Sequence, residues 1–327
     1  MKNEFLTPEE AAARIRSGAV MSIAGASELL AALPKGAWIG GSTVYFMTAE
    51  GGKVDREHLF CTTFPAGTKA EARHLSPEEL PSLASGYVDG GVTLIILPAF
   101  SKAHQSFAED GANYADIFDQ PLLGWISGVH LEEIGTKAPT VYDGATGTAH
   151  EEGAVLLHVT LAAGSNPKLD IVNIFEQGAN PELTFFFEEE GFSAKTAIVN
   201  GREVDFANYV TEKGIDTRLP LVADYAGALI NVSFQAVDTE AGEVKFYAPV
   251  FAGVEYRLAR PQENYAGSFA AQVGQGGAGT YSCNCILNYL YGELEGKSTA
   301  GFTGPVTFGE VAYILLNQTL VKLELAA

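Results

Sequence analysis

Two cysteines separated by a single residue, Cys283 and Cys285, are the side chains of this sequence that most directly suggest chemistry. They follow a glycine-rich stretch and precede residues typical of the first turns of a helix. A thiol at a helix N-terminus has a lowered pKa, because the free N–H groups there favour the thiolate. A nucleophilic cysteine is therefore one interpretation. The other is a small buried residue packed against a sheet, the usual environment of a free cysteine.

The glycine-rich stretch before the cysteines could hold a ligand. Gly274, Gly276 and Gly279 satisfy the G-x-G-x-x-G pattern, but the dinucleotide fingerprint needs a strand before the glycines and a helix after them. Here a helical pattern precedes them and an extended pattern follows, so we predict no cofactor. Glycines also let the backbone approach a small ligand closely. Gly276, Gly277 and Asn284 are therefore candidates for a pocket that includes the two thiols.

Metal binding has little support in the sequence. Structural zinc sites use four sulfur or nitrogen ligands at short, regular spacings, and no histidine lies near either thiol in the sequence. The six histidines are scattered through the first half of the chain and form no H-E-x-x-H pattern. We therefore predict no metal site.

Further polar residues stand in apolar surroundings. Gly309 and Glu310 interrupt the strand-like stretch GPVTFGEVAYILL. A lone acid there has a raised pKa, holds the amino group of a ligand, or points to solvent at a strand end. In the first half, AWIGGSTVYFM mixes β-branched and aromatic residues around paired glycines. This pattern predicts a strand or turn in close contact with another group, and it makes Ser42 and Thr43 candidates for the same pocket.

The elements that position these residues are mostly strands. Thr7 and Pro8, followed by two glutamates, predict a capped helix. β-branched and aromatic runs such as VTLIIL, VLLHVTL and LDIVNIF predict strands, and Asn200-Gly201 between two such runs predicts a type I′ hairpin. The many strands, hairpins and short helices predict an α/β fold of the α+β kind, with mixed, largely antiparallel sheets, flanking helices and two lobes.

Length and charge limit the remaining possibilities. The 327 residues suffice for two domains, and we place them at residues 1–194 and 195–327, with no fixed-period repeat. Lys and Arg number 20 against 40 Asp and Glu, a net charge of −20, which repels nucleic acid and anionic membranes. The sequence shows no signal peptide, no membrane-spanning run and only three cysteines. It therefore predicts a cytoplasmic protein with reduced thiols.

The order of these motifs resembles the FIST family, the F-box and intracellular signal transduction proteins. The cysteine-bearing strand-to-helix junction, the following Gly-Phe…Gly-Glu stretch and the Asn-x-Thr before the last strand are similar to the C-terminal FIST domain. AGVEYRLARPQENY is similar to the segment before that junction, and WIGGSTVYFMTAEGG to the Ser/Thr turn of the N-terminal domain. The resemblance covers most of the chain in order, without an F-box, and implies a two-part sensor of a small molecule. Cys285 and Ile286 stand where the family has an arginine, so Arg257 or Arg260 would have to bind a ligand carboxylate.

We therefore predict a non-enzymatic sensory protein that binds a small molecule, an amino acid or related metabolite, and signals through a protein partner. Two alternatives stay open: a cysteine-dependent enzyme acting on a small metabolite, and a structural subunit of a larger assembly. We predict no catalytic residue. The predicted ligand-binding residues are Ser42, Thr43, Gly276, Gly277, Cys283, Asn284, Cys285, Gly309 and Glu310.

Overall fold

The computed structural model describes residues 1–262, 264–273, 279–299 and 302–326. The chain divides into two compact units. Unit 1 contains Met1–Val172, Phe269–Leu315 and Thr319–Ala327, and unit 2 contains Asn173–Ser268 and Leu316–Gln318.

The division differs from the expected boundary near Ala194, which falls inside unit 2. The physical reason is strand pairing, because the last strands of the chain pair with strands from its first half. A single cut in the sequence therefore cannot separate the two units.

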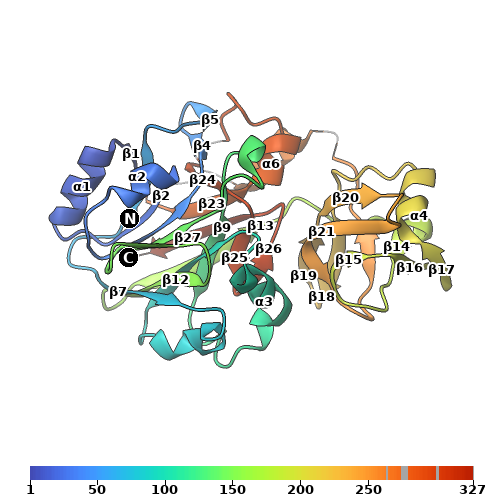
Figure 1. The fold of residues 1–327 in the computed structure, drawn as a ribbon, viewed down its shortest axis with the longest axis horizontal. Helices are drawn as coiled ribbons and strands as arrows, with labels where there is room; N and C mark the ends of the chain where they lie inside the picture. Colours follow the sequence, from blue (N-terminus) through green and yellow to red (C-terminus); the bar gives the residue numbers. More distant parts are fainter. Residues whose placement is uncertain (263, 274–278, 300–301, 327) are drawn as a thin grey trace. The chain divides into compact units, whose positions relative to one another are not determined.

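Among the described residues, unit 1 is built on three six-stranded sheets (Figure 1). Sheet A has the order β1 (Lys2–Leu6), β6 (Leu59–Thr63), β2 (Met21–Gly25), β3 (Trp38–Ser42), β10 (Val141–Asp143) and β11 (Thr148–His150). Sheet B has the order β13 (Asn166–Val172), β27 (Leu320–Ala326), β23 (Tyr281–Cys285), β24 (Gly304–Thr307), β4 (Tyr45–Thr48) and β5 (Gly51–Val54). Sheet C has the order β7 (Lys69–Leu75), β12 (Ala154–Thr160), β8 (Val92–Pro98), β9 (Leu122–Ser127), β25 (Glu310–Ala312) and β26 (Ile314–Leu316).

The three sheets repeat one strand plan. In each sheet the two central strands are parallel and are joined through a helix: α2 (Ser27–Ala31) in sheet A, α6 (Ile286–Tyr291) in sheet B and α3 (Lys102–Asp110) in sheet C. Two antiparallel strands flank one side of each parallel pair, and two strands consecutive in sequence flank the other side. Unit 1 is thus an internal three-fold repeat of structure, which no fixed period in the sequence marks.

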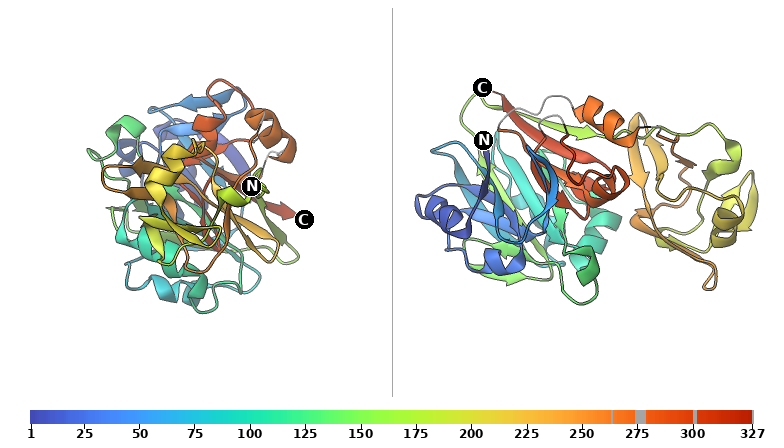
Figure 2. Two further views of the ribbon diagram at one scale, coloured as in Figure 1. Left: turned by 90° about the vertical axis from the view of Figure 1, so that its right-hand side faces the viewer. Right: turned by 90° about the horizontal axis from the view of Figure 1, so that it is seen from above.

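Each sheet is completed by strands from another repeat. β4 and β5 follow β3 of sheet A but join sheet B, whereas β10 and β11 follow β9 of sheet C but join sheet A. β25 and β26 likewise follow β24 of sheet B and join sheet C. Both chain ends lie side by side in unit 1 (Figure 2), where Asn3 Nδ2 donates to Thr280 O at 2.7 Å. The exchanged strands tie the three repeats into one body.

Unit 2 is inserted into the third repeat, between β13 and α5 (Tyr265–Val273). The corresponding connection of the second repeat, between β7 and β8, contains only the short 3-10 helix η1 (Leu80–Gly86). This insertion conceals the repeat in the sequence, because it separates the first strand of the third copy from the rest of that copy.

Unit 2 consists of small antiparallel sheets around a phenylalanine core. One sheet has the order β14 (Thr184–Phe185), β22 (Tyr256–Leu258), β18 (Leu221–Tyr225) and β19 (Ala228–Val232), and another has the order β15 (Gly191–Ala194), β21 (Glu243–Val250) and β20 (Phe234–Asp238). The helix α4 (Phe206–Glu212) follows the hairpin of β16 (Thr196–Val199) and β17 (Arg202–Asp205). Asn200 and Gly201 join that hairpin with φ of 50° and 73°, which confirms the predicted turn.

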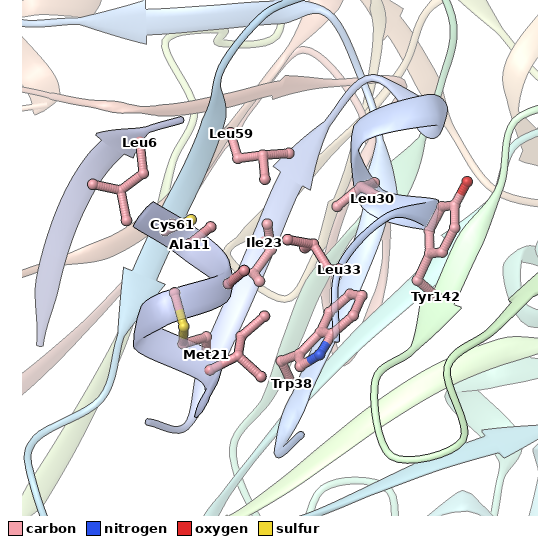
Figure 3. Packing of buried hydrophobic residues seen from close by; sticks show 12 residues of the cluster. Leu6, Ala11, Met21, Ile23, Leu30, Leu33, Trp38, Leu59, Cys61 and Tyr142 are labelled. Atoms are coloured by element: carbon pink, nitrogen blue, oxygen red, sulfur yellow. The ribbon is translucent and has the colours of Figure 1, made fainter. Parts of the chain in front are cut away.

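The first helix shows how local sequence sets the fold of unit 1. In α1 (Pro8–Arg16), Thr7 Oγ1 accepts from the backbone N–H of Glu10, and Glu10 Oε2 accepts from the backbone N–H of Thr7. This capping box begins the helix where the sequence predicts it. The buried Ile15 belongs to a core cluster that also contains Met21 and Trp38 of sheet A, both of which Figure 3 labels.

The predicted fold class is confirmed, because the sheets are mixed and largely antiparallel and short helices flank them. Within the described residues, none of the helices has the length and apolar character needed to cross a membrane.

Candidate functional site

The predicted thiols lie on β23 in the interior of unit 1. Cys283, Asn284 and Cys285 are at most 1 % exposed. Cys283 Sγ donates to the carbonyl of Gly124 at 3.2 Å, and Asn284 Oδ1 accepts from Asn288 Nδ2 at 2.9 Å. The strand-to-helix junction predicted here is confirmed, since Cys285 is the residue that precedes α6.

Glu310 is fully buried beside this strand. Its Oε1 lies 3.1 Å from Thr307 Oγ1, and its Oε2 accepts from Thr319 Oγ1 at 2.8 Å. Burial raises the pKa of the Glu310 carboxyl well above its ordinary value, and the hydrogen bonds from the two threonines only partly oppose this. Burial therefore favours the protonated form of the side chain, which acts here as a buried hydrogen-bonding group.

Burial also favours the protonated form of two of the thiols. Burial raises the pKa of Cys283 well above its ordinary value, with a further contribution from Glu310, and raises the pKa of Cys61 to about 12. A thiol that keeps its proton is a poor nucleophile. The geometry of the junction, which favours a thiolate when exposed, is thus outweighed by burial.

This burial predicts slow thiol chemistry in the native protein. We expect Ellman's reagent to find all three thiols unreactive over minutes at pH 8 and to titrate three after denaturation, because each is at most 1 % exposed. Absorbance at 412 nm, followed with and without guanidinium, measures both states. A rapid stoichiometric reaction of one native thiol would contradict the described packing.

Ser42 and Thr43 lie where the central strands of unit 1 converge. Ser42 ends β3, and its Oγ donates to the carbonyl of Gly128 at 2.7 Å, just after β9. Thr43 Oγ1 donates to the carbonyl of Val306 in β24, also at 2.7 Å. Both hydroxyls are therefore used to join the carboxyl ends of strands from three sheets. Ligands of α/β proteins commonly bind at such strand ends.

A surface hollow opens at these strand ends. It encloses about 270 Å³, including its open mouth, and Ser42 and Thr43 form part of its lining. Ser27 and Glu28 line it from the start of α2, and residues 128–130 from the segment after β9.

Four charged residues of alternating sign line the hollow. Glu133 Oε1 lies 3.1 Å from Arg56 Nη1 and 3.0 Å from Lys137 Nζ, and Lys137 Nζ also lies 3.4 Å from Glu28 Oε1. The hydrogen bonds from Lys137 and Arg56 lower the pKa of Glu133, which keeps its carboxylate ionised. The hollow therefore carries two cations and two anions within reach of one small molecule.

A histidine adds a further polar group. The His130 ring stacks on Tyr45 with centroids 5.5 Å apart, and its Nδ1 accepts from the backbone N–H of Glu132 at 3.3 Å. We assign the proton of the neutral ring to Nε2 on this basis. His130 can thus offer a hydrogen-bond donor to a ligand in the hollow.

The equivalent strand ends of the other repeats carry aromatic rings. A Cβ on Gly128, after β9, would lie only 2.3 Å from the Phe308 ring, which also packs edge-on against Phe100 with centroids 6.2 Å apart. Near β24, Tyr289 packs edge-on against Tyr45 with centroids 5.7 Å apart. Aromatic rings thus border the hollow beside Gly128 and beside His130.

The predicted site residues fall into two groups. Cys283, Asn284, Cys285 and Glu310 gather in the core together with Gly309, which immediately precedes β25; Ser42 and Thr43 line the hollow. Gly276 and Gly277 lie outside the described residues. Arg257 and Arg260 belong to unit 2, where they pair with Glu255 and Glu176.

Sequence reasoning missed the charged residues of the hollow. Arg56 lies between β5 and β6, whereas His130, Glu133 and Lys137 lie between β9 and β10, and together they match no motif. The one available signal was the spacing of Glu133 and Lys137, which is that of an ion pair across one helical turn.

Fold and site together define a mixed α/β protein with an internal three-fold repeat, an inserted β-rich unit and a small charge-lined hollow. The chain belongs to the family of unknown function DUF6976, whose model matches residues 6–326. A comparison with curated proteins gave no match. Among the described residues, no cluster of three or more His, Cys, Asp or Glu could hold a metal ion.

Proposed function

We propose that this protein is a non-enzymatic sensor that binds a small metabolite, such as an amino acid, in the hollow beside Ser42 and Thr43. The observation that carries the proposal is the alternation of Arg56, Glu133, Lys137 and Glu28 around its lining. An α-amino acid presents one carboxylate and one ammonium group, so such a lining complements both of its charges.

The location of the hollow supports this function over a pocket around the thiols. A ligand of Cys283 or Glu310 would have to enter a region where both side chains are fully buried. The hollow is open, lies at the carboxyl ends of strands and offers an arginine, the residue best suited to paired hydrogen bonds with a carboxylate. It also contains the Ser/Thr turn on which the resemblance to the FIST family partly depends.

The alternative of a cysteine-dependent enzyme has less support. The raised pKa values of Cys283 and Cys61 favour neutral thiols, and Glu310 is itself held in its protonated form, so it is a poor general base for a thiol at neutral pH. The thiol titration described above separates this alternative from the sensor.

We further propose a cytoplasmic location and a protein partner that receives the signal. Three free thiols suit a reducing compartment, and the net charge of −20 disfavours nucleic acid as the partner.

A thermal-shift screen against the amino acids and common small carboxylates tests the proposal. A ligand at 100 times its Kd adds about 2.7 kcal/mol of stability, which raises Tm by a few degrees for a chain of this size. We expect Arg56→Gln to abolish the shift, because it removes a carboxylate-binding cation. Arg73→Gln is the matched control, since Arg73 has the same 43 % side-chain exposure and also pairs with one glutamate. A hit that survives in Arg56→Gln would place the ligand elsewhere.

A further inference from the structure

Glu133 occupies the position that a ligand carboxylate would need. One of its oxygens, Oε1, lies within 3.1 Å of both Arg56 Nη1 and Lys137 Nζ, the two cations of the hollow. Its side chain is 24 % exposed, against 89 % for the neighbouring Glu132. The two cations are therefore already neutralised by a carboxylate of the chain itself.

We propose that Glu133 is an internal carboxylate that holds the hollow in its unliganded state and that a ligand carboxylate displaces from Arg56 and Lys137. This inference rests on the proposed function, because it assigns the regulation of the same site. It identifies the ligand class by one feature, a carboxylate small enough to reach both cations.

The interaction is weak enough to be exchanged. Ion pairs between exposed side chains contribute little, because solvent screens them and both side chains lose freedom. Arg56 and Lys137 remain 43 % and 47 % exposed in their pairs. The carboxylate of such a ligand would pair with Arg56 and Lys137, and its ammonium group would pair with the freed Glu133 or with Glu28. The ligand therefore replaces each ion pair that it breaks.

Displacement of the Glu133 carboxylate would also affect residues outside the hollow, because Glu133 connects separate segments. It ends the 3-10 helix η3 (Leu131–Glu133), and its carboxylate reaches Arg56 in the connection between β5 and β6. Through Lys137, the same chain of charges extends to Glu28 in α2. Displacement of the carboxylate would release η3 from Arg56, whereas the backbone N–H of Leu131 would still bond to Tyr45 Oη. The segment after His130 is thus the part of unit 1 that would report ligand binding.

The test uses acetate as the minimal carboxylate and compares two variants of the full chain. Glu133→Gln removes the internal carboxylate, and Glu132→Gln removes the same charge one residue earlier, where the side chain is 89 % exposed and Oε2 lies 3.9 Å from Nδ1 of His130. We expect Glu133→Gln to bind acetate about tenfold more tightly than the wild type, and Glu132→Gln to match the wild type, because only the first variant frees both cations. Chemical-shift titration or calorimetry measures the affinities, and circular dichroism confirms that each variant is folded.

Amide hydrogen exchange gives a second, independent readout. Without ligand, we expect faster exchange across residues 131–137 in Glu133→Gln than in Glu132→Gln, since the connection to Arg56 is lost. Equal acetate affinities in the two variants, or no acetate binding in Glu133→Gln, would overturn the role of Glu133. The sensor proposal would survive that result if an amino acid still stabilised the wild type through Arg56. Conversely, tighter acetate binding with no hit in the metabolite screen would leave the Glu133 exchange standing and remove the support for the sensor.

Discussion

Replacing Gly124 with alanine is expected to destabilise unit 1 by more than about 3 kcal/mol, beyond the usual cost of an overpacked core. Gly124 lies in β9 opposite Ile95 of the parallel strand β8. A Cβ at this position would lie 1.7 Å from the carbonyl oxygen of Ile95. The clash is with backbone in the middle of a sheet, so no side-chain rotation relieves it. Urea unfolding followed by tryptophan fluorescence measures the loss, since Trp125 is the next residue.

Gly111→Ala is the matched control for this substitution. Its backbone is helical, with φ of −53°, and the nearest atom to an added Cβ is a ring carbon of Phe107 at 3.2 Å. We expect a change of less than about 1 kcal/mol there, because a helical alanine is favoured over glycine. A Gly124→Ala variant that unfolds at the urea concentration of the wild type would show that β8 and β9 are not paired as described.

Glu310→Gln is expected to make the protein more stable than the wild type as the pH rises. Because burial raises the pKa of Glu310 in the folded state above the unfolded value of about 4.5, the folded state keeps a proton that the unfolded state releases. The stability that the protonated side chain contributes is complete below pH 4.5 and falls as the pH rises toward the folded pKa. The wild type therefore loses about 1.4 kcal/mol per pH unit from this group in that window.

Glutamine keeps the shape of the protonated side chain and does not titrate. The difference in unfolding free energy between the variant and the wild type should therefore be smallest near pH 4.5 and should grow as the pH rises toward the folded pKa. Glu10→Gln is the control of opposite sign, because hydrogen bonds from Thr7 lower the pKa of Glu10. Removing that carboxylate should cost stability at neutral pH, and the cost should vanish in acid. A pH-independent difference for Glu310→Gln would mean that Glu310 is ionised in the folded state.

Local features of the fold could be predicted from sequence because their causes are local. The capping box of Thr7 and Glu10, the Asn200-Gly201 turn and the junction at Cys285 each depend on a few adjacent residues. The paired glycines of β3 also gave a correct prediction of close contact, since a Cβ on Gly41 would lie 2.6 Å from the Trp125 ring.

The three-fold repeat and the hollow could not be predicted, because both depend on contacts between distant segments. No shared sequence pattern marks the repeats, and unit 2 interrupts the third copy. The hollow joins Arg56 to Glu133, which are far apart in sequence, through an ordinary surface ion pair. The thiols and Glu310 drew attention because acids and cysteines are uncommon in apolar stretches, yet in this structure they are neutral parts of the core.

The exchange of strands among the three sheets has a consequence for how such a chain can change over evolutionary time. Each of the three copies contributes two strands to the sheet of another copy. This closed arrangement would be the same for three separate chains as for one fused chain. Fusion frees the copies from identity, so that charged residues can gather in one hollow while phenylalanine rings pack together elsewhere in unit 1. The same freedom accommodates a whole additional unit in one copy, at a connection where the counterpart in another copy has only a short 3-10 helix.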